Sequence, residues 1–341
     1  MPSIRSRFIR QFVRLRIKHL LLPGVPVSKV RGRTNYLASY GWYPFLVKRE
    51  RFQIGDIPVA AYSPKGIEPR GTILFLHGGG FCFGSIKMYA DLAARLAAAA
   101  QARVVLPEYR LAPEHQYPAA HDDCLRMYEH VVDEITSAPT PGLLPAMSSQ
   151  RRAAATERGE GGRRPDEGTE ARPDSCGRYL NRFAVMGDSA GGGLALATAI
   201  QARDSGLPLP AALAVISPWA DLTCSGPTYE SRRDRDPMLP TEVMSRCAEQ
   251  YAGGADVRDP RLSPLYADLS GLPPLLIQVG TEEILNSDAT RLAEAAGAAG
   301  LNVTFREYDG MWHVWQLFAW AVPEGKQAIV ELGEFARQQW T

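Results

Sequence analysis

A serine stands between two glycines in the segment Gly-Asp-Ser-Ala-Gly, residues 187–191. The segment 182–186, which is apolar after Arg182, precedes this motif, and an Ala-rich run to about residue 203 follows it, so we predict a strand and then a helix. Glycines at such a turn let the backbone lift the Ser189 hydroxyl above the sheet edge, where the helix start directs N–H groups at developing negative charge. The pattern is typical of a nucleophilic serine. Its structural alternative is a packed turn in which Ser189 only caps the helix.

Three consecutive glycines follow the predicted strand at 72–76, in His-Gly-Gly-Gly-Phe at residues 77–81. Backbone N–H groups that no side chain covers are what an oxyanion hole requires. A P-loop is excluded, because no Lys-Ser or Lys-Thr pair follows the glycines. Both motifs come at the carboxyl ends of predicted strands, where parallel sheets bind their ligands. Together they indicate covalent catalysis by a serine far more specifically than either does alone.

A serine nucleophile needs a base, and the base needs an acid that orients it. On a strand-to-helix turn of this kind the chain order is serine, acid, histidine. The only histidine after Ser189 is His313. Three carboxylates follow the predicted strand at 275–279 and are candidates for the acid: Glu282, Glu283 and Asp288. The pattern alone does not separate them.

Strands and helices alternate along most of the chain, which predicts an α/β fold with a mostly parallel sheet covered on both faces. Residues 49–54 and 57–62 flank Gly55-Asp56 and predict a hairpin, hence antiparallel pairing at one edge. Further strands are expected at 72–76, 103–107, 182–186, 212–217, 275–279 and 303–307. Helices are expected at about 87–100, 118–135, 189–203, 241–251, 288–299 and 325–339.

Composition excludes several classes of protein. The chain has 341 residues, 45% hydrophobic and 22% charged, which is ordinary for a globular protein. Its 38 basic and 37 acidic residues argue against a nucleic-acid partner. It contains no run of about 18 apolar residues that could span a membrane. Five cysteines without a C-x-x-C pair disfavour a disulfide scaffold or a zinc site, so we expect neither a metal nor a cofactor.

Charge is distributed unevenly along the chain. Residues 1–49 carry eleven Lys or Arg and no acid, whereas the remaining 292 residues have a net charge of −10. Residues 4–22 predict an amphipathic helix, in which a set of basic side chains surrounds one apolar stripe. The stripe comprises Ile4, Phe8, Phe12, Leu15 and Leu22. Three interpretations remain: a cap helix lying on the fold, a helix on a membrane surface, or an organelle-targeting segment. The expected location is the cytoplasm, with membrane association as the alternative.

Residues 139–178 interrupt the alternation of strands and helices. They are rich in Pro, Gly, Ser and Arg, and no Phe, Trp or Tyr occurs between residues 129 and 178. Low hydrophobicity with mixed charge is typical of a disordered loop. We therefore predict a basic N-terminal helical segment at 1–48 and a catalytic domain at 49–341 with a disordered insert at 139–178.

Five segments together resemble the hormone-sensitive lipase family of α/β-hydrolase esterases. They are HGGGF at 77–81, YRLAPE at 109–114, GDSAGG at 187–192, SPW at 217–219 and the Trp312-His313 loop. The resemblance covers about residues 50–341 without the insert. It implies an eight-stranded sheet, a cap formed by the N-terminal segment and residues 221–262, and oxyanion-hole N–H groups on Gly79, Gly80 and Ala190. It also implies that Glu283 is the acid, in the loop Gly280–Leu285, with Asp288 as a second acidic position nearby.

The resulting functional hypothesis is a cofactor-independent esterase that acts on small-molecule esters with short to medium acyl chains. Ser189 is the expected nucleophile, His313 the base and Glu283 the acid. A second hypothesis is a deacetylase of an acetylated metabolite that uses the same triad. A third is a ligand receptor without catalytic activity, which the joint presence of the three residues disfavours.

Overall fold

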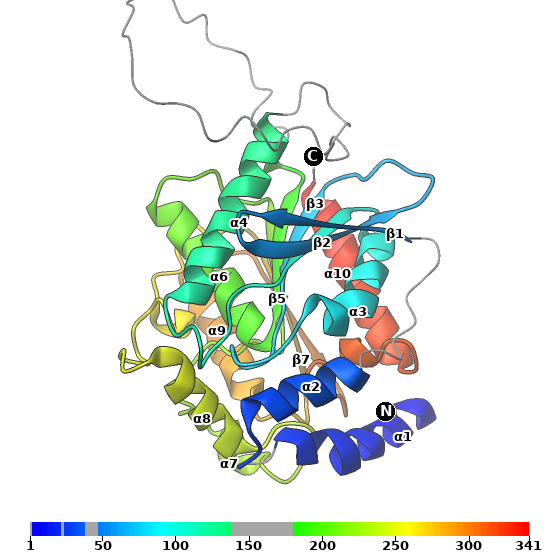
Figure 1. Ribbon diagram of the computed structural model, residues 1–341, viewed down its shortest axis with the longest axis vertical. Coiled ribbons are helices and arrows are strands. Elements are labelled where there is room, and N and C mark those ends of the chain that lie inside the picture. The colour runs from blue at the N-terminus through cyan, green and yellow to red at the C-terminus, as the bar shows by residue number, and fades with distance from the viewer. Residues whose placement is uncertain (1, 22–23, 38–46, 138–179, 341) are drawn as a thin grey trace, which may run out of the picture.

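An eight-stranded sheet forms the centre of the computed structural model, which describes residues 2–21, 24–37, 47–137 and 180–340 (Figure 1). The strand order is β1-β2-β4-β3-β5-β6-β7-β8. The strands are β1 (Val47–Ile54), β2 (Ile57–Pro64), β3 (Thr72–Leu76), β4 (Arg103–Pro107), β5 (Phe183–Asp188), β6 (Ala212–Ile216), β7 (Leu275–Gly280) and β8 (Val303–Tyr308). The predicted α/β class and the eight-stranded, mostly parallel sheet are confirmed.

The antiparallel part of the sheet is the predicted hairpin and its neighbour. β1 pairs with β2, and β2 pairs with β4, both antiparallel. Gly55 lies in the turn of the hairpin with a φ of 58°, a left-handed conformation that glycine adopts without strain. All pairings from β4 through β3 to β8 are parallel, so the carboxyl ends of these strands meet at one edge.

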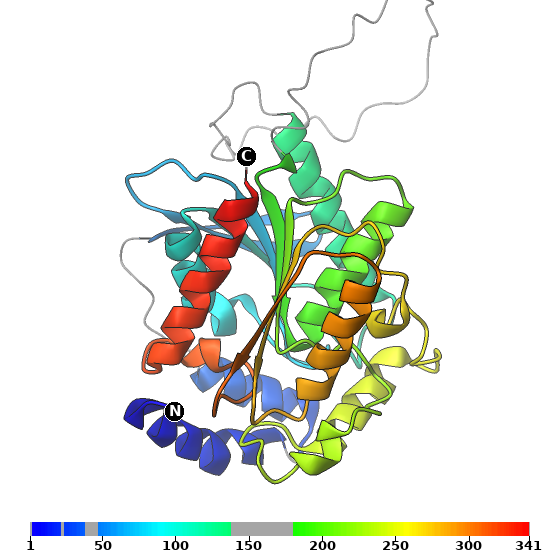
Figure 2. The ribbon, with the colours of Figure 1, turned by 180° about the vertical axis from the view of Figure 1, so that it is seen from behind.

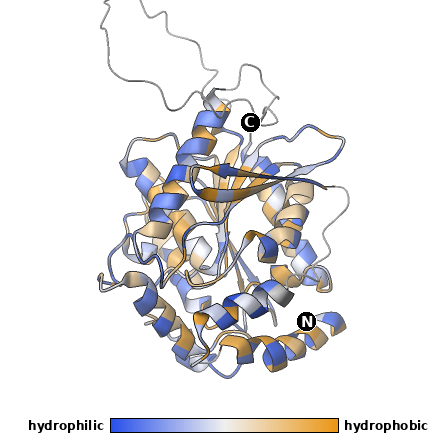
Figure 3. Ribbon diagram, in the orientation of Figure 1, coloured by the Kyte–Doolittle hydropathy of each residue, from blue (hydrophilic) through white to orange (hydrophobic). Residues whose placement is uncertain are grey.

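Helices cover both faces of the sheet, as Figures 1 and 2 show from opposite sides. One face carries α3 (Ile86–Ala100) and α10 (Pro323–Gln339), and the other carries α4 (Ala119–Thr136), α6 (Ser189–Asp204) and α9 (Asn286–Ala298). Alternate residues of β3 therefore enter different cores: Ile73 and Phe75 pack on the side of α3, Leu74 and Leu76 on that of α6. This explains why the central strands are apolar along their whole length (Figure 3).

Four helices gather at the end of the molecule where the parallel strands finish (Figures 1 and 2). They are α1 (Ile4–Phe12), α2 (Val27–Leu37), α7 (Thr228–Ser231) and α8 (Thr241–Ala252). α1 continues through a wider π-helical turn, Val13–Ile17, and a 3₁₀ turn, Lys18–Leu21, so the predicted N-terminal helix is present as far as Leu21. Two further 3₁₀ helices among the described residues are η5 (Pro264–Tyr266) and η6 (Trp315–Phe318).

Two predictions fall partly or wholly outside the described residues. The predicted disordered insert, 139–178, lies in the gap between α4 and β5, and Leu22 of the predicted apolar stripe lies in the gap before α2. A further difference concerns α9, which begins at Asn286, two residues before the predicted start. Asp288 is consequently inside the first turn of this helix.

Candidate active site

Ser189 stands on the turn between β5 and α6 and has a φ of 53°, which is uncommon for a residue with a side chain. Glycines are required on both sides of it. A Cβ atom on Gly187 would lie 2.2 Å from the carbonyl oxygen of Gly191, and one on Gly191 would lie 2.1 Å from that of Leu76. The close packing of β5, α6 and β3 thus accounts for the G-x-S-x-G pattern, and the strained turn points the hydroxyl beyond the sheet edge.

A chain of two hydrogen bonds joins Ser189, His313 and Glu283. The Oγ atom of Ser189 lies 3.0 Å from Nε2 of His313, and Nδ1 of His313 lies 3.1 Å from Oε2 of Glu283. All three side chains are buried. A carboxylate beside Nδ1 favours the tautomer that carries its proton there, which leaves Nε2 to accept the proton of the serine.

The Ser217 hydroxyl and the backbone amide of Gly280 hold Glu283 in this position. Oε1 of Glu283 accepts hydrogen bonds from the Gly280 N–H at 2.6 Å and the Ser217 hydroxyl at 2.8 Å. The Ser217 oxygen in turn accepts the N–H of Val314, the residue after His313, at 3.1 Å. Ser217 therefore connects the loop of the acid to the loop of the base. The sequence motif at 217–219 pointed to this serine, but nothing in the pattern indicated what it contacts.

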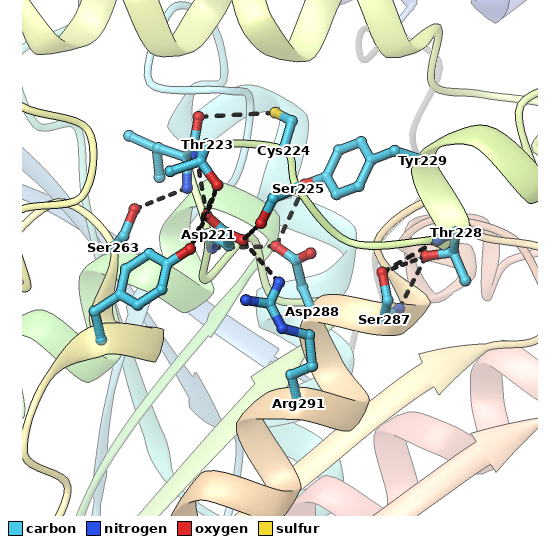
Figure 4. A network of polar contacts seen from close by, with 12 residues as sticks. Asp221, Thr223, Cys224, Ser225, Thr228, Tyr229, Ser263, Ser287, Asp288 and Arg291 are labelled. Atoms are coloured by element: carbon cyan, nitrogen blue, oxygen red, sulfur yellow. Dashed lines mark hydrogen bonds and ion pairs between the residues drawn. The ribbon is translucent and has the colours of Figure 1, made fainter.

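The other two acid candidates face away from His313. Glu282 forms ion pairs with Arg10 and Arg235, each at 2.5 Å. Asp288 accepts hydrogen bonds from the Asp221 N–H and the Tyr229 hydroxyl, within the network that Figure 4 shows around Asp221 and Arg291. Burial and the nearby Asp221 carboxylate raise the pKa of Asp288 well above its usual range. Of the three carboxylates, the geometry brings only Glu283 to the imidazole.

Asp236 is a buried carboxylate that the sequence reasoning missed. Its Oδ2 accepts the N–H of Ile284, which follows Glu283, at 3.0 Å, and its Oδ1 accepts those of Met238 and Leu239. Asp236 thereby connects the segment before α8 to the loop of Glu283. Burial raises its pKa, whereas the charge of His313 and these hydrogen bonds act in the opposite direction. No sequence pattern separates Asp236 from the exposed acids around it, because its role depends on contacts with a loop some 48 residues away.

The glycine loop after β3 presents backbone N–H groups close to Ser189. Gly79 and Gly80 have φ values of 121° and 58°, and neither donates its N–H to any residue that the structure describes. A Cβ on Gly79 would lie 2.1 Å from the Phe83 carbonyl oxygen, so only glycine fits there. Ala190 lies in the first turn of α6, where N–H groups have no acceptor within the helix. These are the three amides that the sequence analysis assigned to an oxyanion hole.

Asp188 joins this loop to the turn of Ser189. Its Oδ1 accepts the Gly78 N–H at 2.9 Å and its Oδ2 accepts the Tyr89 hydroxyl at 2.7 Å. Complete burial raises its pKa to about 7. On the outer side, α8 covers the loop: Tyr251 stacks on Phe81 with ring centroids 3.8 Å apart, and Cys247 lies against Gly80.

Ser217→Ala is expected to lower kcat by about tenfold and to leave KM nearly unchanged. The substitution removes one hydrogen bond to a buried carboxylate, of the order of 1.5 kcal/mol, together with the acceptor of the Val314 N–H. Steady-state kinetics with a p-nitrophenyl ester measure the effect. Ser225→Ala is the matched control, because its hydroxyl also donates to a buried carboxylate, Asp221, outside the triad. Equal losses in both variants would show that Ser217 has no special role in positioning.

Comparison with known proteins identifies the family. A family profile described as the alpha/beta hydrolase fold matches residues 73–317. A solved esterase of the bacterial hormone-sensitive lipase family is 32% identical to this chain and superposes on it with a TM-score of 0.82. The superposition covers 100% of both chains. The chain belongs to the hormone-sensitive lipase family of α/β hydrolases. The resemblance seen in the sequence motifs is thereby confirmed.

Two curated relatives share most of their length with this chain. An acetyl-hydrolase of Streptomyces hygroscopicus is 39% identical over 266 residues, which are 78% of this chain and 75% of the relative. An esterase of Acinetobacter venetianus is 32% identical over 290 residues, or 83% of this chain and 82% of the relative.

Proposed function

We propose that the protein is a serine ester hydrolase in which Ser189 is the nucleophile, His313 the general base and Glu283 the acid. The observation that carries this proposal is the hydrogen-bonded series from Ser189 through His313 to Glu283, at 3.0 and 3.1 Å. Beside it lie the amides of Gly79 and Gly80, which have no acceptor among the described residues. Membership of a hydrolase family supports the same reaction class.

In the first half of the proposed reaction, Oγ of Ser189 attacks the ester carbonyl while Nε2 of His313 takes its proton. The resulting oxyanion receives hydrogen bonds from the N–H groups of Gly79, Gly80 and Ala190, which are in place before the charge develops. Glu283 stabilises the imidazolium through Nδ1. His313 then protonates the departing alcohol, and an acyl group remains on Ser189.

In the second half, a water molecule replaces the alcohol. Nε2 of His313 accepts a proton from this water as it attacks the acyl carbon, and the same amides stabilise the second oxyanion. Collapse of this intermediate returns the proton to Ser189 and releases the carboxylic acid. Every step uses groups of this chain and water alone.

A cap over the site is part of the proposal. The elements that form it are the N-terminal segment, residues 1–48, and residues 221–262. Contacts of α8 with the glycine loop and of Arg10 with Glu282 support this assignment. Residues that cover Ser189 on the side of the sheet edge restrict the size of the acyl group. We accordingly propose small-molecule esters with short to medium acyl chains as substrates.

Deacetylation of an acetylated metabolite is the second candidate function, favoured by the relative from Streptomyces hygroscopicus that is named an acetyl-hydrolase. It would use the same triad, with the acetyl group on Ser189. The two candidates differ in the alcohol or amine that leaves and not in the residues that act.

Kinetics with p-nitrophenyl esters of increasing acyl length test the proposed function. We expect turnover of the acetate and butyrate esters, and a kcat/KM at least about tenfold lower for the palmitate ester. Each methylene group that does not fit the acyl site reduces the free energy with which the enzyme binds the transition state. O-acetylated and N-acetylated small molecules, measured in parallel, separate esterase from deacetylase. Absence of turnover with all of these compounds would favour a ligand receptor and contradict the proposal.

The proposal also includes a peripheral contact between residues 4–22 and a membrane. The concentration of basic residues before Glu50 supports it. Within the described ranges, none of the helices has the length and apolar character to span a bilayer. The contact proposed is therefore one at the surface of the lipid.

A further inference from the structure

Polar side chains make up much of the contact between α1 and the rest of the protein. Ser3 and Ser6 donate hydrogen bonds to the Glu324 carboxylate at the start of α10, and Ser6 is almost completely buried. One turn further on, Arg10 forms an ion pair with Glu282 and donates to the Arg235 carbonyl oxygen at 3.1 Å. Specific polar bonds of this kind fix the rotation of a helix about its axis.

This rotation turns the apolar stripe of α1 toward solvent. The four residues of the stripe that the structure describes are exposed by 44–74%: Ile4, Phe8, Phe12 and Leu15. Spacings of four, four and three residues place them on one face of a helix. A helix that caps a fold normally buries such a face. For a cap helix, the sequence alone favoured burial of the apolar stripe against the fold. In the structure the stripe faces solvent instead.

Arginines border the exposed stripe on both sides. Within α1, at about 100° per residue, Arg5 lies along one border and Arg7 along the other, and Arg14 and Arg16 stand on either side of Leu15 in the π-helical turn that follows. All four are exposed, and none forms an ion pair with a residue in the described part of the chain. Lys29 and Arg33 of α2 are exposed at the same end of the molecule (Figure 1). No acidic residue precedes Glu50, so every charged side chain of α1 and α2 is basic.

We propose that the outer face of α1 docks on the surface of a bilayer that contains anionic lipid, with Phe8 and Leu15 among the acyl chains and the bordering arginines at the headgroups. An apolar stripe between two basic borders is the arrangement that interfacial helices use. A second copy of this chain fits the face poorly, because it would bring the same unpaired arginines together. The inference rests on the proposed membrane contact and adds the face, the orientation and the lipid charge.

The docking would place the active site near the lipid. α1 lies at the end of the molecule where the parallel strands finish, and its Arg10 contacts Glu282, the neighbour of Glu283 (Figure 2). The sheet edge that carries Ser189 is thereby turned toward the bilayer. Esters that partition into the membrane surface would then reach the enzyme from a locally concentrated source.

Co-sedimentation of the full chain with vesicles tests the proposal. We expect binding to vesicles of phosphatidylcholine with phosphatidylglycerol and at least about tenfold weaker binding to phosphatidylcholine alone. Binding should fall steeply as salt rises from about 0.1 M to 1 M, because the Debye length shortens from about 10 Å to about 3 Å. Wild type that binds neither vesicle at low salt would overturn both the membrane contact and this inference.

Two sets of variants test the face. Phe8→Ser with Leu15→Ser, and Arg7→Gln with Arg14→Gln, should each weaken binding at least about tenfold. Hydrolysis of a soluble p-nitrophenyl ester should remain unchanged, since these side chains face away from the fold. Ile67→Ser with Trp320→Ser is the matched control, because both residues are exposed apolar side chains outside α1.

The outcomes are distinguishable from those for the proposed chemistry. Vesicle binding that persists in both sets of α1 variants would assign the contact to another surface and overturn the inference. A concentration-dependent dimer that the Phe8 and Leu15 substitutions abolish, without vesicle binding, would assign the face to a second copy instead. Failure of the proposed reaction would appear as lost ester hydrolysis with vesicle binding intact.

Discussion

Ser189→Ala is expected to lower kcat by about 10⁴–10⁶-fold, with the protein still folded. The hydroxyl oxygen supplies the bond to the acyl carbon, and Nε2 of His313, 3.0 Å away, has no other proton to accept in the first step. Because the nucleophile and the base act as one unit, removal of either one abolishes nearly all of the rate enhancement that the triad supplies. Steady-state kinetics with p-nitrophenyl acetate measure the loss.

The residual rate of the Ser189→Ala variant is informative as well. The amides of Gly79, Gly80 and Ala190 remain in place, so the variant should still exceed the uncatalysed reaction. His313→Ala should show a loss of similar size, and the double variant should be no worse than either single one. Additive losses in the double variant, or a Ser189→Ala variant within about tenfold of wild type, would contradict the assignment of this serine.

Glu283→Gln is expected to reduce kcat by about 10³–10⁴-fold. Glutamine keeps the shape of the side chain and can still accept the hydrogen bonds of Gly280 and Ser217. It removes the negative charge that stabilises the imidazolium, and its amide group can favour the wrong tautomer of His313. The measurement is kcat across the pH range in which the wild type is active, with folding checked by circular dichroism.

Two neighbouring substitutions provide the controls for Glu283. Glu282→Gln weakens ion pairs with Arg10 and Arg235 and should cost less than about tenfold in kcat, because partly exposed pairs contribute little. Asp288→Asn changes a buried network around Asp221 and should act mainly on stability. If Asp288→Asn abolished turnover in a folded protein while Glu283→Gln was mild, the two roles would have to be exchanged.

Local sequence patterns predicted the sheet, the turn of Ser189 and the glycine loop because these features depend on neighbouring residues. Periodicity identified the strands, and glycine is required at 187 and 191 because a Cβ atom there would lie about 2 Å from a neighbouring carbonyl oxygen. The helix α2 was missed, since its sequence contains Gly32 and lacks a clear apolar stripe. The short helices α7, η5 and η6 were not predicted either, whereas the bounds of the predicted strands and helices differ from those observed by only a few residues.

The choice among the three acids could not be made from the residues alone, because it depends on contacts between distant segments. Glu282 is drawn away by Arg10 and Arg235, which lie 272 and 47 residues from it. Asp236 and Ser217 hold the loop of Glu283 through bonds that no local pattern encodes. The orientation of α1 has the same origin, since the bonds of Ser3 and Ser6 to Glu324 determine which face is exposed.

Covalent capture by a fluorophosphonate, followed by peptide mapping, tests the central claim most directly. The reagent reacts with a serine that its own base activates, and the phosphonyl adduct reports the position of the nucleophile. The account predicts one adduct, on the peptide that contains Ser189, and no adduct in the Ser189→Ala variant. An adduct on another residue, or labelling that persists in the Ser189→Ala variant, would contradict it.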